Sequence, residues 1–538
     1  MASLSRKIIV GAGCVLVYAG LAAAQGRGGA SWNTAGNDAQ RTSWVRTDPN
    51  ISVANLQKSG TFQFLWKVKL SNDARQSYSL SQAVDVSSYI GYRGFRSYAF
   101  FGGASNNAIA LDSDLGRVEW ARHFDVSNLP AATAACPGGM TAGVSRPAPL
   151  AAAGAAAAGG GRGAAGGAKS AVGQPGQGAV QVAAQAAGGG RAGGRGGSGG
   201  GGGGRGGGGI GTSALFALAS DGMLHLVYIS NGADSQAPVR FLPANANASG
   251  LTFTDSEAYV STSNNCAGVP NGVWSINLAG TDRTVSTWKT NGGSVIGTAF
   301  DSDGTVYATT GDGDYSPTSF SDSVVALDPK GLKLKDFFTP AKSEFTTGPV
   351  VFSYQNKNLL AVANKDGKVY LLDTAALGGA DHRTPLAQST ALGNVSTGGL
   401  ATWEVDGVRW ILAPVTGGLN SATRFSATNG AVTNGAVAAF KVVDQAGKPS
   451  LQPAWVSRDL TFPLTPAIVN GVVLAVSGGD AQHPAVLYAL DGATGKDLWN
   501  SGTNITSYAR SGISGGSSQF YLGTYDSTVY AFGFLLVK

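Results

Sequence analysis

The sequence predicts an all-β repeat protein, and three observations support this prediction. Short alternating runs such as LYAL at residues 487–490 are typical of strands with one buried face, and no long amphipathic helix pattern occurs. Glycine contributes 81 of the 538 residues and charged residues only 13%, so tight turns must be abundant. A strand–turn–strand unit also recurs along the chain, which indicates a repeat array that one domain can fill at this length.

The clearest copy of the unit is LYALDGATGKDLW, residues 487–499. Asp491 can accept hydrogen bonds from the backbone of its own turn, and Gly495 is free to take a positive φ. A second short strand then ends on Trp499, which gives the spacing A-x-D-x-x-x-G-x-x-x-W. The same spacing occurs in AIALDSDLGRVEW, which ends on Trp120, and weaker copies begin at Val324 and Val369.

This unit resembles the tryptophan-docking repeat of the pyrroloquinoline-quinone (PQQ) β-propellers. That family includes quinoprotein alcohol dehydrogenases and non-catalytic scaffold propellers of the cell envelope. The resemblance implies an eight-bladed β-propeller of four-stranded antiparallel blades, with Trp66, Trp120 and Trp499 as docking residues. Most of the repeated turns are about 40 to 70 residues apart, which suits a four-stranded blade with its loops. Their expected positions are Asp112, Ala219, Asn277, Asp328, Asp373, Lys441, Asp491 and Ala531.

Residues 1–24 have the pattern of an export signal. Arg6 and Lys7 precede an apolar run from Ile8 to Leu21, and three alanines before Gln25 suit cleavage. A membrane anchor is the alternative, but the run is short and no charged stop follows it. We therefore expect a periplasmic or secreted protein with no membrane span after cleavage.

Residues 25–60 are expected to form an N-terminal clasp segment without chemistry, and residues 61–538 the propeller. The sequence GNDAQRT at 36–42, between a tryptophan and an I-x-x-x-N-L run, resembles the opening segment of PQQ propellers. The strand expected at 62–70 carries Trp66 but lacks a repeat start, whereas residues 529–532 start a repeat without its second half. We expect these two stretches to pair in one blade, because pairing removes two exposed sheet edges.

Residues 150–210 form a Gly/Ala-rich insertion within the propeller. We expect this tract to be disordered, because it offers almost no large apolar side chain to bury. The net charge is +6, and the six basic residues between 141 and 210 together with the two in the leader exceed it, which leaves about −2 for the rest of the chain. The remaining chain is close to neutral, so no basic surface for nucleic acid is expected.

In quinoprotein alcohol dehydrogenases, PQQ and Ca²⁺ lie over one end of the propeller axis, an Asp acts as base, and a vicinal disulfide covers the quinone. The resemblance implies three candidate positions here. Asp312 stands in Thr310-Gly311-Asp312, where the enzymes carry T-G-N and supply an oxygen ligand. Glu344 is the only acid of the segment that replaces their Asp-rich catalytic segment, and Trp403 is the candidate stacking ring.

Three departures from the enzymes weigh against catalysis. The catalytic Asp is missing, no two cysteines are adjacent, and the Trp403 segment lacks the paired-tryptophan continuation. The four histidines are scattered singly, without metal-ligand spacing. We therefore expect no catalytic residue, cofactor or metal, and a binding or scaffolding module whose blade-connecting loops hold a protein partner or small ligand. The alternative is a PQQ- and Ca²⁺-dependent oxidoreductase with a rewired site at Asp312, Glu344 and Trp403.

The strand order of a four-stranded blade brings two kinds of connection to the same end of the ring. These are the loops between second and third strands and the links between blades. Asp312 and Glu344 are expected there, on a shallow polar surface and more than hydrogen-bonding distance apart. Cys136 and Cys266 should also share that end, and both a disulfide and two partly buried free thiols remain open.

Overall fold

The computed structural model describes residues 31–75, 79–91, 94–126, 132–150, 214–314, 316, 318–395 and 399–535. The expected export signal lies outside these residues, and so does the Gly/Ala-rich insertion apart from its first residue. Within the described ranges, no helix is long and apolar enough to cross a membrane.

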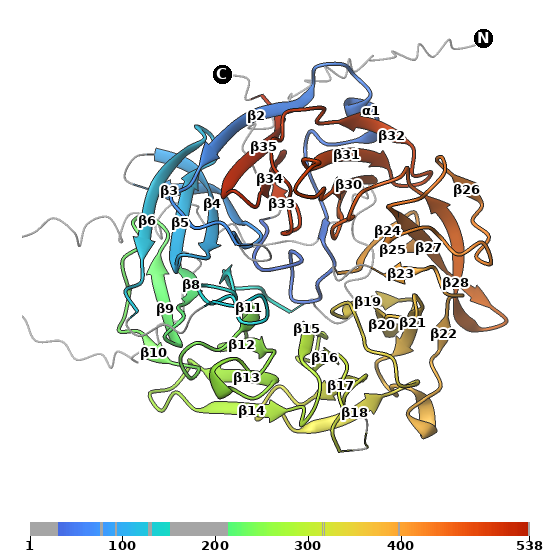
Figure 1. Ribbon diagram of the computed structural model, residues 1–538, viewed down its shortest axis with the longest axis horizontal. Coiled ribbons are helices and arrows are strands. Elements are labelled where there is room, and N and C mark those ends of the chain that lie inside the picture. Colours follow the sequence, from blue (N-terminus) through green and yellow to red (C-terminus); the bar gives the residue numbers. More distant parts are fainter. Residues whose placement is uncertain are drawn as a thin grey trace, which may run out of the picture.

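The described residues form eight β-sheets that surround a central axis as the blades of a propeller (Figure 1). The eight-bladed architecture of four-stranded antiparallel blades is therefore confirmed. Blade 1 consists of β3 (Val84–Gly91), β4 (Gly94–Gly103), β5 (Asn107–Asp112) and β6 (Arg117–His123). Blade 2 consists of β7 (Val144–Ser145), β8 (Ala214–Leu218), β9 (Met223–Tyr228) and β10 (Val239–Arg240). Blade 3 consists of β11 (Ala248–Thr254), β12 (Glu257–Thr262), β13 (Gly272–Asn277) and β14 (Val285–Lys289).

Blades 4 and 5 follow blade 3 around the ring and repeat the same pattern (Figure 1). They are β15 (Val295–Phe300), β16 (Val306–Thr310), β17 (Val324–Leu327), β18 (Leu334–Phe338); and β19 (Val350–Tyr354), β20 (Lys357–Ala363), β21 (Val369–Asp373), β22 (Ala387–Gln388).

Blades 6 and 7 contain additional short strands. Blade 6 is β24 (Ala401–Val405), β25 (Val408–Thr416), β27 (Gly435–Gln445) and β28 (Lys448–Val456), with β23 (Asn394–Val395) and β26 (Ala427–Thr428) added at its edges. Blade 7 is β29 (Ala467–Val469), β30 (Val472–Ser477), β31 (Val486–Asp491) and β32 (Asp497–Asn500), and β1 (Trp44–Val45) joins β29 in parallel.

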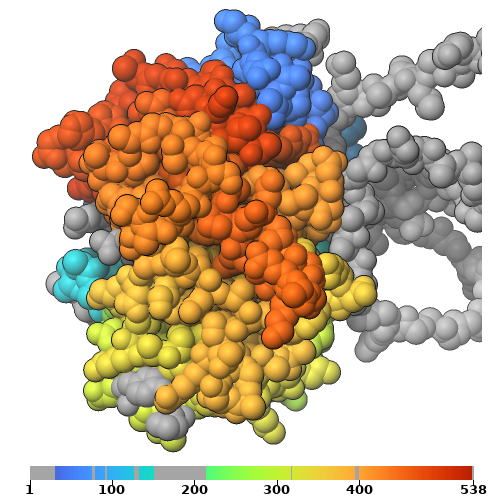
Figure 2. All heavy atoms as spheres, turned by 90° about the vertical axis from the view of Figure 1, so that its right-hand side faces the viewer, coloured from blue at the N-terminus to red at the C-terminus, as the bar shows by residue number. Residues whose placement is uncertain are grey.

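Blade 8 joins the two ends of the propeller. It consists of β33 (Ser514–Gly516), β34 (Gln519–Gly523), β35 (Thr528–Phe534) and β2 (Phe62–Lys69), which follows the short helix α1 (Val53–Leu56). β2 runs antiparallel to β35, with Phe62 opposite Phe534 and Lys69 opposite Thr528. Figure 2 shows the blue N-terminal strand against the red C-terminal blades. The predicted pairing of residues 62–70 with the last repeat is therefore confirmed.

The tryptophans of the repeat dock onto the next blade. Trp66 Nε1 donates a hydrogen bond to the Ser113 carbonyl of blade 1, at 3.0 Å. A Cβ added to Gly116 would overlap the Trp66 ring, so this turn needs glycine. Trp120 Nε1 donates to the Ile229 carbonyl of blade 2, at 2.8 Å. The glycine of one repeat and the tryptophan of the preceding blade therefore form one contact.

Other blade interfaces use related aromatic contacts. Trp499 packs edge-on against Phe62 of blade 8, with ring centroids 4.9 Å apart. Trp455 of blade 6, which the sequence analysis missed, donates from Nε1 to the Gly492 carbonyl of blade 7 at 2.8 Å. Between blades 4 and 5, Asp336 takes the tryptophan position and accepts a hydrogen bond from the Leu377 N–H at 2.8 Å, and the ring of Phe338 lies against Gly378.

Two of the expected turn positions are wrong. Ala219 lies between β8 and β9, one hairpin too early, because the insertion separates β7 from β8 and makes the second strand resemble a third. The corresponding turn of blade 2 comes after β9, at residues 229–232, where Trp120 docks. Lys441 lies within β27, since the outer hairpin of blade 6 extends to Gln445 before it turns.

The described part of the clasp segment crosses the centre of the ring (Figure 1). It hydrogen-bonds to all eight blades in chain order. From blade 1 to blade 8, the bonding groups of the clasp are Trp32 O, Asn33 O, Thr34 Oγ1, Ala39 O, Gln40 O, Thr42 O, Ser43 O and the Asp48 carboxylate. Arg41 adds bonds from Nε to Thr298 O and from Nη2 to Gly250 O. One strand of backbone thus connects every inner edge of the propeller.

Candidate functional site

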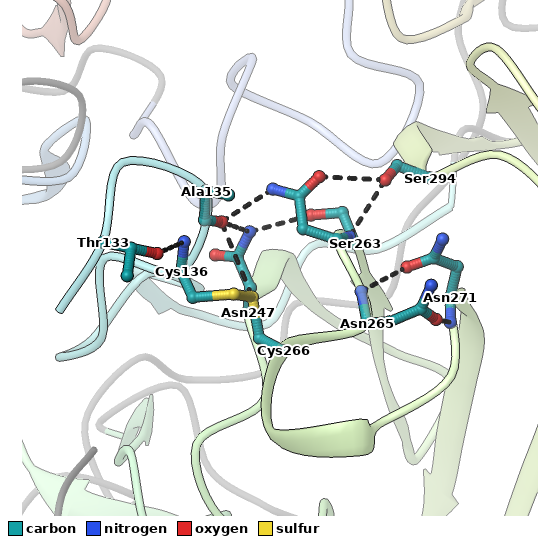
Figure 3. The surroundings of a disulfide bond; sticks show 10 residues. Thr133, Ala135, Cys136, Asn247, Ser263, Asn265, Cys266, Asn271 and Ser294 are labelled. Atoms are coloured by element: carbon teal, nitrogen blue, oxygen red, sulfur yellow. Dashed lines mark hydrogen bonds between the residues drawn. A yellow bond between two sulfur atoms is a disulfide. The ribbon is translucent and has the colours of Figure 1, made fainter. Parts of the chain in front are cut away.

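The loops between second and third strands and the links between blades emerge on one end of the ring, which we name the link face. Cys136 lies in the link from blade 1 to blade 2, and Cys266 in the β12–β13 loop of blade 3. The two form a disulfide with a Cα–Cα distance of 5.6 Å (Figure 3). Of the two alternatives that the sequence left open, the structure has the disulfide. The bond spans blade 2, the blade that contains the insertion.

Asp312 and Glu344 meet on the link face between blades 4 and 5. The Asp312 backbone N–H donates to Glu344 Oε2 at 3.4 Å, and the Phe345 N–H donates to the Thr310 carbonyl at 3.3 Å. Our expectation that Asp312 lies beyond hydrogen-bonding distance of Glu344 is therefore wrong. The reason is that the buried Phe345 and its hydrogen bond to the Thr310 carbonyl hold the link close to the loop that carries Asp312.

Glu344 already has a cationic partner. Lys365 Nζ lies 2.8 Å from Glu344 Oε1, and this hydrogen bond raises the pKa of the Lys365 ammonium. The Glu344 carboxylate thus receives an N–H from the Asp312 backbone and an ammonium from blade 5. A metal ion or a substrate hydroxyl that bound this carboxylate would have to displace one of these two donors, and the lost hydrogen bond would cost free energy.

Asp322 is a buried carboxylate behind this pair. Its side chain is fully buried, and neither of its oxygens has a hydrogen-bond partner in the described part of the chain. Burial raises the pKa of Asp322 to about 6, and the charges of Asp312 and Glu344 add to the rise, whereas Lys342 and Lys365 oppose it. The sequence contains no signal for this residue beyond one acid in a serine-rich stretch.

Replacing Asp322 by Asn is expected to stabilise the protein at neutral pH. The pKa in the folded state lies above the ordinary value of 3.8, so the ionised form destabilises. This penalty is absent below about pH 4 and complete above about pH 7, and the stability of the unmodified protein falls across that window. We expect Asp322→Asn to gain about 1–2 kcal/mol at pH 7.5 and almost nothing at pH 4, measured by urea unfolding.

The control for this prediction is Asp366→Asn, at an exposed position of the next hairpin. It should shift the unfolding free energy equally at both pH values. A gain for Asp322→Asn that is the same at pH 4 and pH 7.5 would show that the Asp322 charge is not the cause.

Trp403 is remote from Asp312 and Glu344 in its contacts. Its side chain is 1% exposed and stacks on Trp410 of the neighbouring strand, with centroids 5.2 Å apart and planes at 13°. Both rings belong to the core between blades 6 and 7. The structure therefore brings two of the three candidate residues together and leaves Trp403 in a packing role.

A well of about 240 Å³ lies at the axis, and residues of the clasp segment form part of its lining. Arg41 lies at its floor, and burial lowers the pKa of that guanidinium to about 10, so it stays charged at neutral pH. Its walls come from the first strands of the blades and the residues just before them, and five of these wall residues are glycines: Gly250, Gly297, Gly348, Gly399 and Gly512. The described lining includes no aromatic ring and no carboxylate.

These residues do not fit PQQ with Ca²⁺ as the family holds them. The well offers nothing flat to stack on the quinone, and Trp403 cannot reach it from the blade core. The residues that the structure describes also include no group of three or more His, Cys, Asp or Glu side chains placed to share a metal ion. No step of a quinone mechanism can be assigned to Asp312 or Glu344.

A larger pocket lies beside the disulfide on the link face, and we name it the disulfide pocket. It has a volume of about 430 Å³. Its lining comes from the connections of blades 1 to 3, namely Asp73, Arg75, Ala104, Ser105, Asn106, His123, Phe124, Val126, Ala132, Cys136, Pro137, Gly138, Gly139, Asn245, Asn247, Cys266 and Ala267. Of this set only the two cysteines could be recognised from the sequence, because most of the others lie in irregular loops without a motif.

Comparison with solved structures supports the fold. A europium-containing methanol dehydrogenase shares 11% sequence identity, covering 95% of this chain and 98% of that chain, with a TM-score of 0.55. A quinohemoprotein alcohol dehydrogenase from Pseudomonas putida shares 12% identity over 95% of this chain and 81% of that chain, with a TM-score of 0.52. BamB from Moraxella catarrhalis shares 13% identity over 88% and 98%, with a TM-score of 0.46.

No protein-family model matches the chain, and no curated protein matches it. At these identities the similarity concerns the fold alone. It confirms the quinoprotein-type propeller that the docking repeat predicted, because dehydrogenases of this architecture align along almost the whole chain.

Proposed function

We propose that this protein is an exported, non-catalytic propeller that binds a ligand or partner through the loops of its link face. The observation that carries the proposal is the disulfide pocket, a concave site of about 430 Å³ built from the connections of three blades. Pockets of roughly 300–1,000 Å³ are typical of small-molecule sites. Binding residues often lie on loops that a rigid scaffold positions.

Export is supported by two independent features. The leader has the charge and apolar pattern of a signal, and Cys136 and Cys266 are paired. Stable disulfides are typical of oxidising compartments such as the periplasm or the extracellular space. A binding site on the link face would then face the solvent of that compartment.

An oxidoreductase is the second candidate, and the approach of Asp312 to Glu344 is the observation that favours it. Fold cannot separate the two classes, because function resides in the loops. The binding role is preferred because Glu344 is neutralised by Lys365 and because Trp403 lies in the blade core.

A reconstitution experiment distinguishes the two functions. With PQQ, Ca²⁺ and a primary alcohol, the protein is expected to show no change in quinone absorbance and no dye reduction. A quinoprotein alcohol dehydrogenase under the same conditions serves as positive control. Stoichiometric, Ca²⁺-dependent PQQ binding with turnover that disappears in Asp312→Ala would overturn the proposal. PQQ binding without turnover would support a binding role with the quinone as ligand.

A further inference from the structure

The disulfide pocket lies away from the axis of the propeller. None of its lining residues contributes to the axial well, and it is formed by the links that lead into blades 1, 2 and 3 together with loops of blades 1 and 3. What it could bind is decided by three properties of its walls: their rigidity, their charges and their apolar surface.

Hydrogen bonds and the disulfide hold the walls in place. The Ala135 carbonyl, next to Cys136, accepts from Asn264 Nδ2 at 2.7 Å and Asn247 Nδ2 at 3.4 Å (Figure 3). Asn247 Nδ2 also donates to Ser263 Oγ at 2.9 Å. On the opposite wall, Asn106 Nδ2 donates to the Phe124 carbonyl at 2.7 Å. The pocket is therefore preformed, which reduces the entropic cost of binding.

Two opposite charges line the pocket without satisfying each other. Asp73 and Arg75 both face it, no ion pair joins them, and neither side chain has a hydrogen-bond partner in the part of the chain that the structure describes. Their backbones are fixed. The Asp73 N–H donates to Ser105 Oγ at 2.7 Å, and the Arg75 N–H donates to Ser79 Oγ at 2.7 Å.

The remaining surface of the pocket is largely apolar. The apolar part of the lining includes the buried Phe124, Pro137 and the disulfide, whereas both charges come from the link between β2 and β3. A ligand that matches this pocket needs one anionic group, one cationic group and a modest apolar body. A ligand with only a positive or only a negative group would leave either Arg75 or Asp73 without a partner.

We infer that the disulfide pocket binds a small zwitterion, either a free amino acid or a short peptide with free termini. Its carboxylate meets Arg75, because the guanidinium is suited to bidentate carboxylate recognition. Its ammonium meets Asp73, and its side chain lies against Pro137 and the disulfide. This inference rests on the proposed binding function of the link face and names its ligand class.

The test uses isothermal titration of the full protein with L-leucine and with the dipeptide alanyl-leucine, each in four forms. These are the free compound, the N-acetyl derivative, the C-terminal amide and the doubly blocked compound. The free amino acid or the free dipeptide is expected to bind, which distinguishes the two sources. Each single block is expected to weaken binding about tenfold, the usual effect of losing one charged hydrogen bond.

Variants of the protein test which residue recognises each end of the ligand. In Arg75→Gln, binding of the free ligand should fall about tenfold, and amidation should then cause almost no further loss. In Asp73→Asn, the same should hold for N-acetylation. Arg240→Gln and Asp282→Asn, which change charges outside the pocket, should bind as the unmodified protein does. Ligand blocking leaves the protein unchanged, so this readout does not depend on how the variants fold.

Several outcomes would refute the inference. They are the absence of binding by both free ligands, equal binding of free and blocked forms, or full affinity in Arg75→Gln. If no free zwitterion binds but a doubly blocked compound binds and this binding is lost in Cys136→Ser, the ligand class is wrong and the binding function of the link face stands. Alcohol oxidation with PQQ and Ca²⁺ would instead refute the proposed function itself.

Discussion

Deleting residues 529–538 is expected to prevent the protein from folding. The deletion removes nearly all of β35, the strand that pairs with both β2 and β34 in blade 8. Val529, Tyr530, Ala531 and Phe532 are fully buried there. Without them the ring opens at two sheet edges and loses the core of its closing blade, a loss larger than the roughly 5–15 kcal/mol by which most proteins are stable. Soluble yield and far-ultraviolet circular dichroism measure the result.

A point variant tests the same contact in a chain that still folds. Phe532→Ala removes a buried ring between Phe64 and Trp499 and is expected to reduce the free energy of unfolding by about 3–5 kcal/mol. Phe95→Ala is the matched control, because that ring is 72% exposed and should change stability by less than about 0.5 kcal/mol. A truncated chain that unfolds cooperatively at the temperature of the full chain would refute the role of the closing blade.

The parts of the fold that could be predicted are those with local chemistry in the repeat. Asp491 accepts hydrogen bonds from the backbone of its own turn, as its position suggested. Trp66 and Trp120 each dock on the glycine-containing turn of the next blade. Closure followed from two incomplete repeats that complete each other. In each case the contact requires a side chain of a defined type, so it can be predicted from the sequence.

Other features of the fold do not depend on residue type and could not be predicted. Most bonds from the clasp segment to the eight blades use its backbone carbonyls, which every residue provides. The insertion hid the true strand order of blade 2, because one short strand precedes it and three follow. The repeat alone therefore could not place Ala219 correctly.

The candidate site shows the same division. That Asp312, Glu344 and the cysteines share the link face follows from strand order alone. The contact between Asp312 and Glu344 depends on how deeply Phe345 is buried, and the pairing with Lys365 comes from the next blade. Asp73 and Arg75 line the same pocket as the disulfide only because the links that lead into blades 1, 2 and 3 converge. Contacts between loops from different blades produce no repeat pattern, so a single sequence does not reveal them.

The glycine of the docking repeat provides the second large effect. Gly495 has a φ of +72° in the turn after β31, and a Cβ added there would overlap the ring of Trp455 from blade 6. Gly471 has a φ of +77° in the turn after β29, but a Cβ added there would meet no atom within 4 Å. The two glycines therefore share the backbone requirement and differ in the docked tryptophan.

Gly495→Ala is expected to cost about 3–4 kcal/mol, as the sum of left-handed backbone strain and overpacking against Trp455. Gly471→Ala should cost only the strain, about 1–2 kcal/mol. Urea unfolding of both variants measures the difference. Trp455→Leu, combined with Gly495→Ala, should then cost less than the sum of the single changes, because the smaller side chain relieves the overlap. Equal losses in the two alanine variants, or full additivity with Trp455→Leu, would mean that the blades are held together by their sheets alone and that the docked tryptophan only fills space.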